Sequence, residues 1–184
     1  MSQDMRRKMI VRAVLPLVIE HGAAVTTAQV ARAAGIGEGT VFRAFKDKNE
    51  LIEACVLEAL CPDDVLRAVA EISLDQPLAD RLEEAADALS AHLRRIGAMV
   101  AAMQTSGRPP TRGPDAPRPD RRQSFLAVRG AVAELFEPDR DRLRLPAEQL
   151  GRIFLSMPLS RVRDDQQARA AELVDAFLNG AVTA

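Results

Sequence analysis

Tryptophan and tyrosine are absent from this chain of 184 residues, and its only aromatic side chains are six phenylalanines. A ligand site in this protein therefore has no phenolic hydroxyl or indole N–H to donate. Cysteine occurs only at Cys55 and Cys61, whose spacing lacks the close pairing and the histidine partners of a zinc site. We expect two reduced thiols that pack in a cytoplasmic protein, with a redox pair as an alternative. The sequence predicts no metal and no cofactor.

Long hydrophobic runs are also missing. No run of about eighteen apolar residues occurs, so the sequence predicts no membrane span. The first residues enter an amphipathic helix that contains acids, which argues against a signal peptide and favours a cytoplasmic location. Neither sign of charge dominates, since the net charge is −1 with 47% hydrophobic and 28% charged residues. This composition is typical of a globular protein of one or two domains.

Signatures of catalysis are missing as well. No glycine-rich phosphate loop follows a strand, and no serine or cysteine is spaced with histidine as in known nucleophile motifs. The sequence therefore predicts that the protein is not an enzyme.

The apolar residues recur every three or four positions, which is the period of a helix, and no alternating strand pattern occurs. Residues 78–103 predict one long amphipathic helix, and residues 105–119, with five prolines and two glycines, predict a loop. Further helices are expected over 48–60, over 63–74, after Asp120, after Pro146 and after Asp164-Asp165. The helix after Asp120 is expected to bury Phe125, Val128, Val132, Leu135 and Phe136, and the next helix to align Leu150, Ile153, Phe154 and Met157. The predicted fold class is all-α.

Residues 26–48 read as two short helices joined by a tight turn. Thr26 or Thr27 can cap the first helix by accepting a backbone N–H, and Gly35 stands where that helix can end in the left-handed region. Val41 and Phe45, four residues apart, supply the buried side of the second helix. This is the helix-turn-helix arrangement, whose second helix lies in the major groove of DNA.

The outward face of the second helix is small and polar, which favours contact with DNA. Gly37 and Gly39 each cost about 1 kcal/mol of helix stability relative to alanine, and a purely structural hairpin has no reason to contain them. Thr40 can donate to a phosphate, and Arg43 can donate to guanine O6 and N7. Lys48 opens the next helix behind Asp47 as a cap and can bind a second phosphate.

The segment resembles the DNA-binding domain of the tetracycline-repressor (TetR) family, and the resemblance is specific over about residues 5–60. The matching residues are Thr27, Val30-Ala31, Ala34-Gly35-Ile36, Gly39-Thr40-Val41-Phe42, Phe45, Lys48 and Leu51. The resemblance implies phosphate contacts from Thr27, Thr40 and Lys48, and base contacts from Gly37, Glu38, Gly39 and Arg43. Phe42 stands where the family often has a tyrosine, so its ring lacks the phosphate-donating hydroxyl. Ala44 stands where a polar residue is frequent and offers only methyl contact.

Local charge agrees with DNA binding. Residues 1–48 contain eight lysines and arginines against four acids, a local charge of +4. Arg6, Arg7 and Lys8 form a basic start that either reaches the DNA or serves solubility.

The resemblance implies a three-helix helix-turn-helix DNA-binding domain over residues 1–47 and a helical ligand-binding and dimerisation domain over residues 48–184. The two C-terminal helices would pair with a second copy in a four-helix bundle and form a homodimer. Their apolar faces could instead cap the core of a single chain.

A small-molecule effector of unknown identity is also implied, and its pocket would be aliphatic and rich in methionine. The candidate lining residues are His92, Met99, Met103, Phe125, Phe154 and Met157. Such a lining favours an apolar or amphipathic compound, although each of these residues can equally belong to an ordinary core.

The sequence therefore predicts a cytoplasmic transcriptional regulator, a repressor that a small effector releases from a palindromic double-stranded DNA operator. The alternative is a helical ligand-binding or scaffold protein of the same fold without sequence-specific DNA binding.

Overall fold

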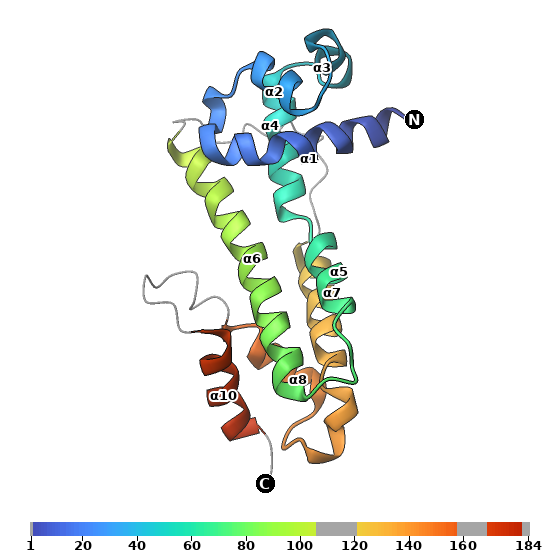
Figure 1. The fold of residues 1–184 in the computed structure, drawn as a ribbon, viewed down its shortest axis with the longest axis vertical. Helices are drawn as coiled ribbons and strands as arrows, with labels where there is room; N and C mark the ends of the chain where they lie inside the picture. Colours follow the sequence, from blue (N-terminus) through green and yellow to red (C-terminus); the bar gives the residue numbers. More distant parts are fainter. Residues whose placement is uncertain (1, 106–120, 158–168, 182–184) are drawn as a thin grey trace. The chain divides into compact units, whose positions relative to one another are not determined.

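The computed structural model describes residues 2–105, 121–157 and 169–181, and within these ranges the chain is helical (Figure 1). The α-helices are α1 Gln3–His21, α2 Thr27–Ala33, α3 Glu38–Ala44, α4 Lys48–Leu60, α5 Asp63–Ala70, α6 Leu78–Thr105, α7 Arg121–Glu134, α8 Ala147–Phe154 and α10 Ala170–Ala181. Two short 3-10 helices, η1 Gly22–Ala24 and η2 Glu137–Arg142, follow α1 and α7. No strand occurs in the described ranges, and the predicted all-α class is confirmed. The proline-rich segment and the expected caps at Asp164-Asp165 lie outside these ranges.

The chain forms two compact units. Unit 1 comprises residues 1–61 and 95–119, and unit 2 comprises residues 62–94 and 120–184. The long helix α6 contributes its first part to unit 2 and its last part to unit 1. Unit 1 includes α4, so this compact unit extends beyond residue 47, where the sequence-based DNA-binding domain was expected to end.

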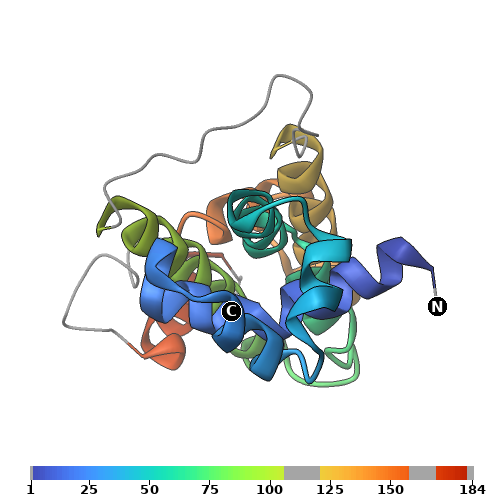
Figure 2. The same ribbon diagram turned by 90° about the horizontal axis from the view of Figure 1, so that it is seen from above.

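The core of unit 1 forms where α1 packs on α2, α3 and α4. Ile10, Val14 and Val18, spaced four apart on α1, are fully buried, as expected for one face of a helix. In Figure 1 α4 runs across α1, which is seen lengthwise both there and in Figure 2. Met99 and Met103, near the end of α6, complete this core.

Unit 2 is built around α6, α7, α8 and α10. The rings of Phe136, Phe154 and Phe177 meet edge to face, with centroids 5.6 to 6.4 Å apart, an arrangement that favours aromatic pairs. Gly151 on α8 lies against α7, where a Cβ at this position would be 3.2 Å from the backbone nitrogen of Ala133. The absence of a side chain therefore lets these two helices approach closely.

Two predicted inward residues point elsewhere. Phe125 was expected in the core, but it is 54% exposed near the start of α7. Ile153 is 41% exposed, although its neighbours Leu150 and Phe154 are buried as predicted. On α7 and on α8, the apolar residues therefore extend beyond the face of the helix that is buried in the described part of unit 2.

The two thiols differ in environment. Cys55 is fully buried in the core of unit 1, and burial, with a smaller effect from the charge of Glu58, raises its pKa to about 12. A thiol with this pKa stays protonated at neutral pH and is a poor nucleophile. Cys61 is half-buried at the end of α4. None of the helices in the described ranges is long and apolar enough to cross a membrane.

Candidate nucleic-acid interface

The turn between α2 and α3 is fixed by hydrogen bonds within residues 26–36. Thr26, rather than Thr27, is the N-cap of α2, and it exchanges hydrogen bonds with Gln29 as a capping box. At the other end the amide of Ile36 donates to the carbonyl of Ala31 over 3.0 Å. Gly35 lies between them with φ +64°, in the left-handed region that glycine adopts readily. Thr26 therefore caps α2 and Gly35 forms the turn, as expected from the sequence.

Helix α3 buries one side and exposes the other. Val41 and Ala44 are buried in the core of unit 1, and so is Phe45, which comes directly after the helix. The opposite side presents residues that the sequence assigned to DNA contact, and each of these is exposed: Gly37, Glu38, Gly39, Phe42 and Arg43. The ring of Phe42 is 58% exposed, a large apolar surface on so short a helix.

The two glycines of α3 are not required by the protein's own packing. A Cβ added at Gly37 or at Gly39 would meet no atom within 4 Å. Neither residue has a positive φ, so an L side chain would fit the backbone as it stands. The open space beside them is on the outward face, where it allows another molecule to approach the backbone of α3 closely.

Three of the predicted contact residues surround one shallow hollow. Thr27 from α2, Phe42 from α3 and Lys48 from α4 line it together with Asp47 and buried apolar side chains. The Lys48 ammonium donates to the carbonyl of Ala23 over 2.8 Å, and Asp47 caps α4 by accepting from the amide of Glu50. An ammonium has three donors, so this bond leaves Lys48 able to bind an anion as well. Thr40 is half-buried beside this face.

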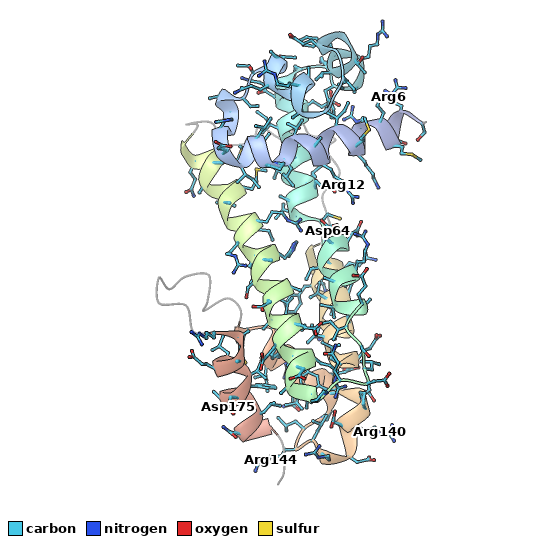
Figure 3. All side chains as sticks on the ribbon, viewed as in Figure 1. Arg6, Arg12, Asp64, Arg140, Arg144 and Asp175 are labelled. Carbon is cyan, nitrogen blue, oxygen red and sulfur yellow. The ribbon has the colours of Figure 1, made fainter. Side chains whose placement is uncertain are left out.

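Arg7 does not extend outward with its basic neighbours. Its guanidinium donates to the carbonyl of Ala44 at the end of α3, pairs with Glu50 over 2.7 Å and lies 4.4 Å above the ring of Phe45. Arg7 therefore fastens α3 to α1 and α4, a role that the sequence did not indicate. Arg6 and Lys8 are exposed on α1, and Arg6 is labelled in Figure 3.

The carboxylate of Glu50 is the partner of Arg7 in this ion pair. Its second carboxylate oxygen accepts the backbone amide of Lys46 over 2.5 Å. That backbone hydrogen bond lowers the pKa of Glu50, and Arg7 adds to the effect, against a smaller opposing contribution from partial burial. Spacing could not reveal this pairing, because Arg7 and Glu50 are 43 residues apart.

The residues proposed as an effector lining are distributed over both units. Met99 and Met103 belong to the core of unit 1. Phe154 is buried in the core of unit 2, and Met157 packs against that core. His92 is half-buried on α6, and Phe125 is exposed on α7. In the described ranges these six residues do not form the lining of one cavity.

Comparison with known proteins identifies the helix-turn-helix. Residues 10–55 match the family model of the bacterial regulatory proteins of the tetR family. A comparison with curated proteins gave no match. The geometry and this match together define an all-α protein with an N-terminal helix-turn-helix DNA-binding domain. The N-terminal helix-turn-helix is thus similar to the DNA-binding domain of this family, as the residues from Thr27 to Leu51 indicated.

Solved structures share the fold over almost the whole chain. A TetR transcriptional regulator from Streptomyces coelicolor is 23% identical with a TM-score of 0.61, covering 97% of this chain and 99% of its own. A tetR-family regulatory protein from Rhodococcus RHA1 is 19% identical with a TM-score of 0.55, covering 97% and 98%. The ketosteroid transcriptional regulator KstR2 of Mycobacterium tuberculosis is 16% identical with a TM-score of 0.52, covering 97% and 96%. At these identities the likeness shows a common fold.

Proposed function

We propose that this protein is a homodimeric cytoplasmic repressor that binds a palindromic DNA operator through α3. The observation that carries the proposal is the outward face of α3. It combines an exposed guanidinium at Arg43 with open space beside Gly37 and Gly39. Its opposite side is held in place by the core and by Arg7. A rigid helix with a small, polar outer face suits the major groove.

Each exposed residue has a role in this proposal. Arg43 donates to guanine O6 and N7, and Glu38 accepts from a cytosine amine or excludes wrong sequences. Gly37 and Gly39 let the backbone of α3 approach the base edges. Phe42 gives apolar contact at the edge of the groove, in place of a hydroxyl. Thr27, Thr40 and Lys48 bind phosphates on either side and fix the register of the helix.

A dimer supplies the second recognition helix. Two copies of α3 have to meet half-sites about 34–36 Å apart, or a multiple of that distance. We assign the dimer contact to α8 and α10, which are the C-terminal helices in the described ranges. Support comes from Ile153, which exposes an apolar side chain on α8. A symmetric partner would cover such a side chain.

Release of DNA by a small effector completes the proposed cycle. Binding in unit 2 would favour a dimer geometry in which the two copies of α3 no longer match the operator. A difference in affinity of about 1–3 kcal/mol between the two geometries is enough for this coupling. One protein of the same fold is named for ketosteroid regulation, which is compatible with a small organic effector here.

DNA binding tests the proposal directly. The full chain is titrated against fluorescent DNA from upstream of its own gene and against scrambled DNA, each at two salt concentrations. We expect tighter, salt-dependent binding to the upstream DNA, and the Arg43→Ala variant should lose about 1–3 kcal/mol and much of the sequence preference. Arg140→Ala, which removes an exposed arginine of η2 in unit 2 (Figure 3), is the matched control and should bind like the wild type. Absence of binding to either DNA at low salt would refute the proposal and favour a ligand-binding or scaffold protein of this fold.

A further inference from the structure

The shallow hollow of unit 1, where α2, α3 and the start of α4 meet, is small and largely apolar. Its volume is about 10 Å³, close to the smallest space that holds one water molecule. A phosphate group or a ring is too large to enter it, whereas a single methyl group is of the right size. Five of the eight residues that line it are apolar: Val30, Val41, Phe42, Phe45 and Leu51.

The ring of Phe42 is the part of this apolar wall that another molecule can reach. It is 58% exposed, and the other four apolar lining residues are buried. The sequence indicated methyl contact from Ala44, but Ala44 is buried in the core of unit 1 and cannot supply it. Apolar contact between α3 and a partner therefore falls to Phe42.

The polar lining residues determine which kind of group fits inside the hollow. The ammonium of Lys48 donates to the carbonyl of Ala23 over 2.8 Å, and this neutral partner leaves its positive charge in place. Asp47 lines the hollow too, and its carboxylate accepts from the amide of Glu50 at the start of α4. A carboxylate in the wall repels an anion inside the hollow, and the ammonium attracts one beside it. The lining thus favours an uncharged group in the hollow and a phosphate next to Lys48.

Thymine offers this combination of groups. It is the DNA base that carries a methyl group, at C5, in the major groove, and phenylalanine is one of the side chains that contact this methyl group. The C5 edge of a pyrimidine lies on the backbone side of the groove, so the methyl group points toward the phosphate of its own strand. A methyl group in the hollow and a phosphate at Lys48 can therefore come from one strand.

We propose that Phe42 and the hollow bind a thymine methyl group in each half of the operator, next to the phosphate that Lys48 holds. This inference rests on the proposed function, because it names a base that α3 reads. Burying one methyl group increases affinity about fourfold, and two half-sites together increase it about fifteenfold. Thymine at this position is thus selected without a hydrogen bond to the base.

The test compares two forms of one DNA fragment from upstream of the protein's own gene, made with deoxythymidine or with deoxyuridine. Uracil pairs with adenine as thymine does and lacks only the C5 methyl group. Fluorescence anisotropy with the full chain should show that the deoxyuridine form binds about fifteenfold more weakly. Phe42→Ala should bind the deoxythymidine form more weakly than the wild type does and should distinguish the two forms by less than about threefold. Phe125→Ala is the matched control, because it removes a phenylalanine of similar exposure (54%) from α7 in unit 2 and should keep the full preference.

Circular dichroism establishes that both variants fold. Equal binding of the wild type to the two forms would overturn the thymine site and leave the proposed function intact, because the operator is still bound. An undiminished preference for the deoxythymidine form in Phe42→Ala would also overturn it, because the methyl group would then be bound elsewhere. If the wild type binds neither form at low salt, the proposed function fails and the thymine site fails with it.

Discussion

Arg7 and Glu50 form an ion pair with 2.7 Å between Nη2 and Oε1, and this pair joins the N-terminal part of α1 to the first turn of α4. The same guanidinium donates to the carbonyl of Ala44, the last residue of α3. The C-terminal end of a helix carries unpaired carbonyls and partial negative charge, so a guanidinium is stabilising there. Helix α3 is therefore held at its end by a residue of α1 that lies outside the exposed face of α3.

The first prediction concerns this connection. Arg7→Ala should cost about 1 kcal/mol of folding free energy, because both partners of the ion pair are about one-third exposed and solvent screens it. Operator affinity should fall while its slope against salt concentration stays the same, because no phosphate contact is lost. Fluorescence anisotropy over a salt series measures both quantities. Arg140→Ala, which removes an exposed arginine of unit 2, is the control, and a slope reduced by about one in Arg7→Ala would show that Arg7 contacts phosphate.

A second prediction follows from the lowered pKa of Glu50. A carboxyl whose pKa is lower in the folded state than in the unfolded chain stabilises the fold above the unfolded pKa, and this stabilisation is lost as pH falls through the folded pKa. Glu50→Gln should therefore be less stable than the wild type at pH 7, and the two should converge as pH falls below the ordinary value of 4.5. Urea unfolding between neutral and acidic pH measures the difference. Glu84→Gln, an exposed carboxylate of α6, is the control. A constant gap at all pH values would contradict the assignment.

The third prediction separates stability from DNA binding at Gly39. A Cβ there meets nothing within 4 Å, so Gly39→Ala should stabilise the free protein by up to about 1 kcal/mol through helix propensity. The same methyl group should weaken operator binding, because it occupies the space where DNA approaches. Gly130→Ala in α7 is matched, since its Cβ also meets no atom within 4 Å. It should raise Tm similarly and leave DNA binding unchanged. Equal operator affinity in both variants would place the DNA elsewhere.

Lys48 gives the fourth prediction. Lys48→Ala should weaken binding to all DNA sequences alike and reduce the salt slope by about one. Because its ammonium also donates to the carbonyl of Ala23, we expect a small loss of stability, within about 1 kcal/mol for an exposed hydrogen bond. Binding to operator and scrambled DNA, with urea unfolding alongside, tests this. A selective loss on the operator alone would mean that Lys48 reads bases.

The local parts of the DNA-binding domain could be predicted from sequence. The cap by Thr26, the turn at Gly35 and the cap by Asp47 each depend on residues within a few positions of one another. Such hydrogen bonds are set by the backbone conformation of a short segment, and the residue types that make them are few. The family match over residues 10–55 then confirmed what these signals indicated.

Long-range partners could not be predicted in this way. Arg81 reaches Leu135 and Asp139 across 54 and 58 residues, and helical periodicity carries no information on which distant helix covers a given face. This missing information on distant partners also explains why Phe125 was wrongly predicted to be buried. Its spacing continues the face of Val128 and Val132, yet its 54% exposure shows that the described part of unit 2 does not reach it. The proposed effector residues were chosen from the same kind of pattern. Met99 and Met103 belong to one core, Phe154 and Met157 belong to or pack against the other, and His92 and Phe125 are part of neither.

The exposed position of Phe42 on α3 is suited to a fluorescent reporter. Because the chain has neither tryptophan nor tyrosine, the wild-type protein emits almost no light under near-ultraviolet excitation. An indole placed at this exposed position, where it need not fit into the core, would be the sole source of emission. Its quenching by nucleobases would report the docking of α3 without any added dye.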